Sequence, residues 1–221
     1  MLVTKPSNQD GRRTQHEHRD RDHSGNSFGT VRPEDARSVL PGARPREALD
    51  DDVPVHEELL ADPKVIEASK KWPFCRRVDK RVQNLLFYED PDYGFVLNGL
   101  VFAPDFDKGV PDHLHDHGHI YTLYGLLDGR QRILRYERID NRSRPDYAEV
   151  RSVSNSECGP GEIDLVRPWE IHAEASIGER VVALIARSEK SGGFLQGRYV
   201  PAKNSYWQGY GPLQVPTAFY G

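Results

Sequence analysis

The apolar positions divide the chain into a polar segment, a short helical segment and a long series of strands. Residues 1–50 carry few apolar side chains, and such a segment cannot bury enough surface to offset the entropy of ordering it. From 54 to 72 apolar residues recur at helical spacing, with Asp62 placed to cap a helix that starts at Pro63. We therefore expect a disordered or extended polar tail over 1–50 and one folded domain over 51–221, with N-terminal helices at about 54–72.

Beyond residue 80 the chain alternates between runs rich in β-forming side chains and clusters of Gly, Pro, Asp and Asn. The runs return roughly every 10 residues with no helical pattern between them, which predicts an all-β sandwich or barrel. The aromatic segment 205–221 is too apolar to be free, so we expect it to pack on the barrel or on a second subunit. The predicted strands cover 82–90, 95–104, 120–129, 130–139, 148–153, 162–167, 170–175 and 180–189.

Composition limits the cellular locations and the classes of binding partner that we expect. Of the residues, 37% are hydrophobic and 29% are charged, the formal net charge is −4 and the sequence pI is about 6.1. Nucleic acid and anionic membranes both select basic surfaces, so neither is an expected partner. No run of 18 apolar residues is present, and the two cysteines make no disulfide framework. We therefore expect a soluble cytoplasmic protein.

Four of the nine histidines stand at alternate positions in the stretch DHLHDHGHIYTLYGLLDG, residues 112–129. They are His113, His115, His117 and His119. On an extended strand alternate side chains share a face, and two imidazoles two residues apart can reach one metal ion. Imidazole suits iron, nickel, copper and zinc. The pattern predicts a metal site, with a polar strand edge as the alternative.

Two spacings resemble the metal-binding motifs of the cupin superfamily. Gly129 lies 12 residues after His117, and His172 lies 11 residues after Gly161. Counting back from Gly129 assigns His115 and His117 to the metal pair, and the third imidazole is then His172. The resemblance implies a cupin double-stranded β-helix, which is a jelly-roll barrel, with a divalent metal held by these three histidines.

The chain departs from the cupin motifs at one ligand. The first motif carries a glutamate that would fall at Tyr121 or Thr122, and neither residue is acidic. In the second motif Trp169 replaces the inner glycine and Ser176 replaces the asparagine. A site of three histidines without a carboxylate is therefore expected.

Such a three-histidine site is similar to that of the thiol dioxygenases, the cysteine dioxygenase family. The block NLLFYEDPDYGFVLNGLVFAPDFDKGVPDHLHDHGHIYTLYGLLDG has the family's order of a strand, an Asp-Pro turn, a second strand, His-Asp-His and a Leu-x-Gly ending. The resemblance covers roughly residues 80–200. It implies an iron(II) dioxygenase that uses O2, with nickel, manganese or zinc as other metals. Cupins often pair through their sheets, so a homodimer is an expectation of the family alone.

The surroundings of the metal differ from the family's pattern. Gln83 stands where an arginine that binds the substrate carboxylate is expected. Some bacterial members resemble this, with an arginine farther along the chain, and Arg198 is the candidate for it here. The family's Ser-His-Tyr relay would fall at Ile185, Arg187 and Glu189. The identity of the substrate therefore does not carry over with the resemblance.

Residues near the three histidines have both functional and structural interpretations. Tyr121 could orient oxygen or substrate, or simply pack in the barrel. Arg187 and Glu189 could clamp a substrate carboxylate and move a proton, or pair with each other. His119 could donate a hydrogen bond to a ligand, or only line the pocket. The candidate catalytic residues are Tyr121, Arg187 and Glu189, and the candidate substrate-binding residues are Gln83, His119 and Arg198.

Three neutral imidazoles leave the charge of a divalent ion uncompensated, which favours an anionic ligand such as a thiolate, enolate or phenolate. They also leave about three positions open on a six-coordinate iron, enough for a chelating substrate and dioxygen. Oxidation of a thiol to a sulfinate is the function that we expect from this combination. Cleavage of a diketone or hydroxyketone, isomerisation, and binding of a ligand without catalysis are the alternatives.

Overall fold

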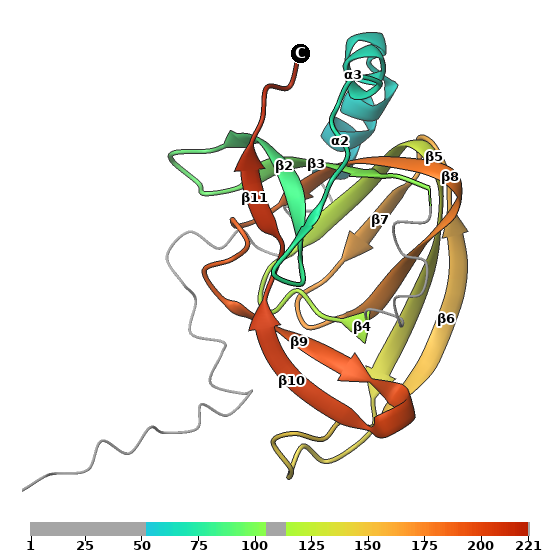
Figure 1. Cartoon of the computed structure of the whole chain (residues 1–221), viewed down its shortest axis with the longest axis vertical. Helices are drawn as coiled ribbons and strands as arrows, with labels where there is room; N and C mark the ends of the chain where they lie inside the picture. Colours follow the sequence, from blue (N-terminus) through green and yellow to red (C-terminus); the bar gives the residue numbers. More distant parts are fainter. Residues whose placement is uncertain (1–51, 105–113, 221) are drawn as a thin grey trace, which may run out of the picture. The chain divides into compact units, whose positions relative to one another are not determined.

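Strands make up most of the structure, and two short helices precede them. The computed structural model describes residues 52–104 and 114–220 (Figure 1). The predicted tail over 1–50 and the side chain of His113 lie outside these residues. The helices are α2 (Asp52–Ala61) and α3 (Pro63–Ser69). Neither of them is long and apolar enough to cross a membrane.

Helix α3 begins in the way that the sequence predicts. The carboxylate of Asp62 accepts a hydrogen bond from the backbone N–H of Lys64 at 2.8 Å, and Pro63 occupies the first turn, where its missing N–H leaves no bond unmade. The prediction of short N-terminal helices is confirmed.

The strands form one curled sheet, with antiparallel pairing throughout except for the parallel pair of β11 and β2 (Figure 1). The predicted all-β fold, a jelly-roll barrel with short N-terminal helices, is confirmed. The strands are β1 (Arg77–Val78), β2 (Arg81–Glu89), β3 (Val96–Phe102), β4 (Leu114–His115), β5 (Thr122–Arg138), β6 (Val150–Cys158), β7 (Ile163–Val166), β8 (Ile171–Arg187), β9 (Leu195–Val200), β10 (Ser205–Tyr210) and β11 (Leu213–Pro216).

Two long strands, β5 and β8, connect the two ends of the sheet. Each has 17 residues, and they pair from Thr122 and Arg187 at one end to Tyr136 and Ile171 at the other. Strands β3 and β7 join them at the first end, and β4 and β6 join them at the second. The long pair therefore links the apolar core to the region that contains His172.

The sequence predicts each long strand as two short ones, and the structure corrects this. The expected breaks fall at Gly129 and around Gly178, whose φ angles are +77° and +95°. The β5–β8 register is irregular between Leu126 and Arg130. Glycine adopts positive φ at little cost, so at these positions the strands bend and continue instead of ending.

Strand β9 (Leu195–Val200) is an element that the sequence pattern does not predict, because Gly197 interrupts an already short apolar run. The C-terminal segment, in contrast, has the expected role. Strand β11 pairs with β2, and Trp72 donates a hydrogen bond from Nε1 to the carbonyl oxygen of Phe219 at 2.9 Å. The aromatic segment thus packs on the barrel of its own chain.

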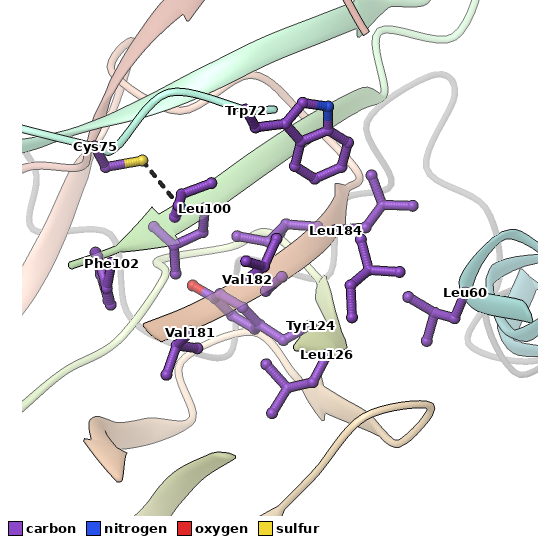
Figure 2. Packing of buried hydrophobic residues seen from close by; sticks show 14 of the residues in the cluster. Leu60, Trp72, Cys75, Leu100, Phe102, Tyr124, Leu126, Val181, Val182 and Leu184 are labelled. Carbon is purple, nitrogen blue, oxygen red and sulfur yellow. Dashed lines mark hydrogen bonds between the residues drawn. The ribbon is translucent and has the colours of Figure 1, made fainter. Parts of the chain in front are cut away.

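The main hydrophobic core lies where the helices, β3, β5 and β8 meet, as Figure 2 shows. The Trp72 ring packs against Phe87 and Phe219, with centroid distances of 4.5 and 5.5 Å. The Sγ of Cys75 accepts a hydrogen bond from the backbone N–H of Val101. The buried residues labelled in the figure are Leu60, Trp72, Cys75, Leu100, Phe102, Tyr124, Leu126, Val181, Val182 and Leu184.

We expect Gly129→Ala to destabilise the fold much more than Gly178→Ala. Both replacements force a Cβ into the positive-φ region, which costs about 1–2 kcal/mol. At Gly129 the new Cβ would also overlap the carbonyl oxygen of Arg180, whereas at Gly178 no described atom lies within 4 Å. Urea unfolding should show an additional loss of about 2 kcal/mol for Gly129→Ala. Equal losses would mean that the backbone at Arg180 yields without cost.

Candidate metal centre

Three imidazoles from two distant segments converge on one point. His115 on β4 is the register partner of His172 on β8, and His117 follows β4 directly. The Nε2 atom of His117 lies 3.2 Å from that of His115 and 3.2 Å from that of His172. With metal–nitrogen bonds of about 2.1 Å, nitrogens this far apart subtend about 100° at the ion. The three residues therefore fit one face of a metal ion.

A clamped turn sets the direction of His117. Strand β4 ends at His115, and the chain turns at Gly118, whose φ is +62°. The carboxylate of Asp116 accepts hydrogen bonds from the N–H groups of Gly118 and Gly197 at 2.8 and 2.9 Å, and from the Tyr199 hydroxyl at 2.7 Å. Asp116 thus points away from the histidines and ties the turn to β9.

The turn also separates His119 from the other histidines. Its side chain is exposed, and its Nε2 lies 2.9 Å from the Glu189 carboxylate. The four alternating histidines therefore do not share one extended strand. Of the sequence-predicted residues, His119 and Glu189 form this surface pair, so the structure does not place Glu189 beside Arg187.

Thr122 orients His117. Its Oγ1 lies 2.9 Å from His117 Nδ1, and Thr122 is fully buried. When Thr122 Oγ1 accepts a hydrogen bond from the Nδ1–H of His117, the Nε2 lone pair is left to point at the metal position. Thr122 has no expected role from the sequence beyond being one of the two motif positions where the missing glutamate would fall.

Glu174 adds a carboxylate beside the three histidines, where the sequence predicts none. It follows His172 by two residues on β8 and therefore lies on the same face. Ligand atoms of His115, His117, His172 and Glu174 all lie within 4.8 Å of one another. The Oε1 of Glu174 is buried, has no hydrogen-bond partner in the described residues, and lies 3.6 Å from His172 Nδ1. The two-residue strand period after His172 is the signal that could have identified it.

The tyrosine that reaches the site is Tyr124 and not the predicted Tyr121. The Tyr124 hydroxyl is 3.5 Å from His117 Nε2, and Thr122 faces the same way. Tyr121 lies just before β5, where its backbone N–H donates to Ser188 Oγ at 3.1 Å. The inward positions of this strand are therefore the even-numbered ones, and the predicted inward direction of Tyr121 is corrected.

Two arginines, the buried Arg187 and the partly buried Arg198, lie at the site without an ion-paired carboxylate in the described part of the chain. Arg187 donates from Nη1 to Asn98 Oδ1 at 2.8 Å and from Nη2 to the Tyr124 hydroxyl at 3.4 Å. Arg198, the register partner of His115, donates from Nη2 to Gln196 Oε1 at 3.2 Å and to a backbone carbonyl. Because these acceptors are neutral, the cations can bind an anion.

A third arginine, Arg135, differs because it has carboxylate partners. Its guanidinium forms ion pairs with Asp164 and Glu170, and its Nη1 lies 3.4 Å from His172 Nδ1. Gln83, the last of the three predicted substrate-binding residues, lies on β2, where its backbone N–H donates to the carbonyl oxygen of Arg76 at 2.7 Å. No hydrogen bond joins Gln83 to the three histidines across the described ranges.

Burial and positive neighbours keep His117 and His172 neutral. Burial, with added repulsion from Arg135, Arg198 and Arg187, lowers the pKa of His172 to about 3. Burial and the adjacent imidazoles hold the pKa of His117 well below its usual value. A neutral imidazole is the form that binds metal, so protons compete weakly for this site at neutral and mildly acidic pH.

Comparisons with known proteins identify no relative by sequence. No family model matches the chain, and no curated protein matches it. Among solved structures, the Schizosaccharomyces pombe Cnp3 cupin domain is similar at 9% identity and a TM-score of 0.39, over 55% of this chain and 72% of that chain. A conserved protein of Klebsiella pneumoniae with a double-stranded β-helix domain is similar at 13% identity and a TM-score of 0.32, over 51% and 75% of the two chains.

A third solved structure is an oxalate oxidase in complex with glycolate. It is 13% identical with a TM-score of 0.31, and the match covers 43% of this chain and 42% of that chain. The match thus spans less than half of the oxalate oxidase. At these identities the likenesses concern the fold alone, and function has to be argued from the side chains of this protein.

We expect Glu174→Gln to weaken metal binding about 10- to 100-fold, the range found for carboxylates that support metal ligands. The amide keeps the shape of the side chain but removes the negative charge beside the histidines. Titration of the metal-free protein with iron(II) without oxygen measures the change. Glu189→Gln, at the exposed carboxylate, is the control and should leave affinity unaltered. If Glu174→Gln binds as tightly as the natural protein, the three histidines suffice.

The metal-free protein should lose stability as the pH falls from about 6.5 toward 4.5. In this range the unfolded chain protonates its histidines, whereas His117 and His172, with lowered pKa values in the fold, do not. The unfolded state then binds more protons, and each such histidine contributes about 1.4 kcal/mol per pH unit. Denaturant unfolding at several pH values should show a smaller slope for His172→Gln. An unchanged slope for His172→Gln would contradict the assignment.

Proposed function

We propose that this protein is a non-haem iron(II) dioxygenase that oxidises a small anionic thiol to its sulfinate. The observation that carries the proposal is the set of three converging imidazoles beside Arg187 and Arg198, whose hydrogen bonds go to neutral groups. The stoichiometry is a thiol plus dioxygen giving a sulfinic acid. Both oxygen atoms end on sulfur, so no separate reductant is needed.

The donor set fits iron because imidazole ligands on one face leave the opposite positions open. Bound iron supplies a centre at which the thiolate and dioxygen meet. The protein's own groups select and orient the substrate around that centre. Because iron would supply the reaction centre and the protein would select the substrate, the charges of the side chains around the metal position decide which class of substrate binds.

Arg198 binds the carboxylate of the substrate. It is the register partner of His115, so its side chain emerges one strand away from a metal ligand. Burial lowers the pKa of its guanidinium, which means that the charge is poorly solvated and gains from an anionic partner. A thiol whose carboxylate lies a few bonds from sulfur can reach both the metal and Arg198.

Tyr124 is the hydrogen-bond donor nearest to the metal position. Burial raises the pKa of its hydroxyl, so it stays protonated at neutral pH. Arg187 lies over its ring at 5.8 Å and holds the hydroxyl from one side. The hydroxyl can therefore donate to an oxygen atom of the ligand while Arg187 and Asn98 keep it in place.

Glu174 favours a second candidate, a dioxygenase that cleaves a diketone or hydroxyketone. Its buried Oε1 without a partner can accept the proton of a carbon flanked by carbonyl groups. The resulting enolate is also an anion that suits the open face of the metal. Cleavage of a diketone thus requires Glu174 as the proton acceptor, whereas binding of a mercaptocarboxylate requires Arg198 for the carboxylate.

Oxygen uptake by the iron(II)-loaded full chain separates the candidates. We expect uptake with 3-mercaptopropionate or cysteine, one dioxygen consumed per sulfinate formed, and at least tenfold weaker uptake with cysteamine, which lacks a carboxylate. Arg198→Gln should raise KM for 3-mercaptopropionate at least tenfold and leave cysteamine unchanged. Arg130→Gln, at an exposed arginine paired with Glu157, is the control.

Two results would overturn the proposal. Uptake with pentane-2,4-dione but with no thiol would support the second candidate. Tight iron binding without uptake for any compound would indicate a cupin that binds metal or ligand without catalysis.

A further inference from the structure

A row of side chains crosses the sheet on the face that carries the histidines. Arg135 on β5 is the register partner of His172, and His172 is the partner of His115. Across the next strands His115 is the partner of Arg198, and Arg198 is the partner of Trp207 on β10. Directly paired residues of neighbouring strands project from the same face. Trp207 therefore lies on the metal face, two strands beyond His115.

The residues on the opposite face of β4, β9 and β10 agree with this placement of Trp207. Leu114 is the partner of Tyr199, and Tyr199 is the partner of Tyr206. These three residues belong to a separate buried cluster, in which the rings of Tyr199 and Tyr206 are 5.2 Å apart. Since Tyr206 faces that cluster, the adjacent Trp207 faces the other way, toward the side of the histidines.

Trp207 is available to a ligand. Half of the residue, 50%, is exposed. In the described segments no ring pair or cation–π contact involves its indole. Two strand spacings place its backbone about 10 Å from that of His115. Strands β4, β9 and β10 lie side by side, with β10 at the end of this path (Figure 1). The indole is thus a rim residue of the metal face.

The order along the row limits what can bind. A molecule that follows it meets the metal position first, then the Arg198 guanidinium, then the Trp207 indole. These groups prefer, in turn, an anionic donor atom, a carboxylate, and an apolar or aromatic group. Other aromatic side chains are exposed as well. Trp207 differs from them because its strand register places it next to Arg198, which is the register partner of His115.

We propose that Trp207 determines substrate selectivity by holding an apolar or aryl group of a mercaptocarboxylate whose carboxylate binds Arg198. This inference rests on the proposed function for the thiol and the carboxylate, and it adds the third group. The preferred substrate is therefore a 3-mercaptopropionate with an apolar substituent next to its carboxylate.

The test compares binding of 3-mercaptopropionate and 2-benzyl-3-mercaptopropionate to the iron(II)-loaded full chain without oxygen, by calorimetry. The natural protein should bind the benzyl compound at least tenfold more tightly. Trp207→Ala should bind both equally, with affinity for the unsubstituted acid and for iron unchanged. Trp207→Phe, which keeps an aromatic ring, should retain part of the preference. Tyr93→Ala, at an aromatic residue 69% exposed, should retain all of it.

Equal affinity of the natural protein for the two compounds would overturn the inference, and so would a benzyl preference that survives Trp207→Ala in a protein with an unaltered melting temperature. The outcome is separable from that of the proposed function, because binding is measured without turnover. A benzyl preference that depends on Trp207, together with no oxygen uptake, would reject the dioxygenase and keep the selectivity role. Oxidation of thiols without a preference for the benzyl compound would support the dioxygenase and reject the selectivity role of Trp207.

Discussion

The antiparallel pairing of β5 with β8 is the constraint on which both the core and the metal centre depend. At one end of β8 the residues 181–185 are completely buried, which locks the register of the strand there. At the other end the same strand carries His172 and Glu174. A shift by one residue would turn both toward the opposite face and present Ala173 instead. Burial of apolar side chains at one end thus fixes the metal ligands at the other.

The site contains positive charge that the fold itself does not neutralise. The buried Arg187 and the partly buried Arg198 donate to an amide, a hydroxyl and backbone or side-chain carbonyl oxygens, while Arg135 has two carboxylates. Burying a cation without a counter-charge costs free energy, and replacing such a group by an apolar one often stabilises a protein. This local conflict between stability and charge is typical of a place where a ligand completes the electrostatics.

The predicted metal ligands and the residues proposed to select the substrate lie on different strands of one ladder. The histidines lie on and beside β4 and on β8, whereas Arg198 and Trp207 belong to the β9–β10 hairpin. Asp116 couples the two, since its carboxylate binds the N–H of Gly197 and the hydroxyl of Tyr199 on β9. The hairpin can therefore change its side chains without changing the ligands, provided that this clamp is kept.

The sequence by itself determined the strand-rich class, the capped helix at Pro63 and the spacing that selects His115, His117 and His172. The strand-rich class and the helix follow from local periodicity and capping chemistry, and the three histidines follow from the resemblance of their spacing to the cupin motifs. Only the tertiary structure decided which neighbours face the histidines. Treating the stretch from His113 to Tyr121 as extended put all its odd positions on one face. The turn at Gly118 breaks that alternation, so Thr122 and Tyr124 point inward while His119 pairs with Glu189. Trp207 likewise shares the face of the histidines through the register of distant strands, which pairing across the sheet establishes and no local pattern encodes, whereas Glu174 follows His172 by the two-residue period of one strand.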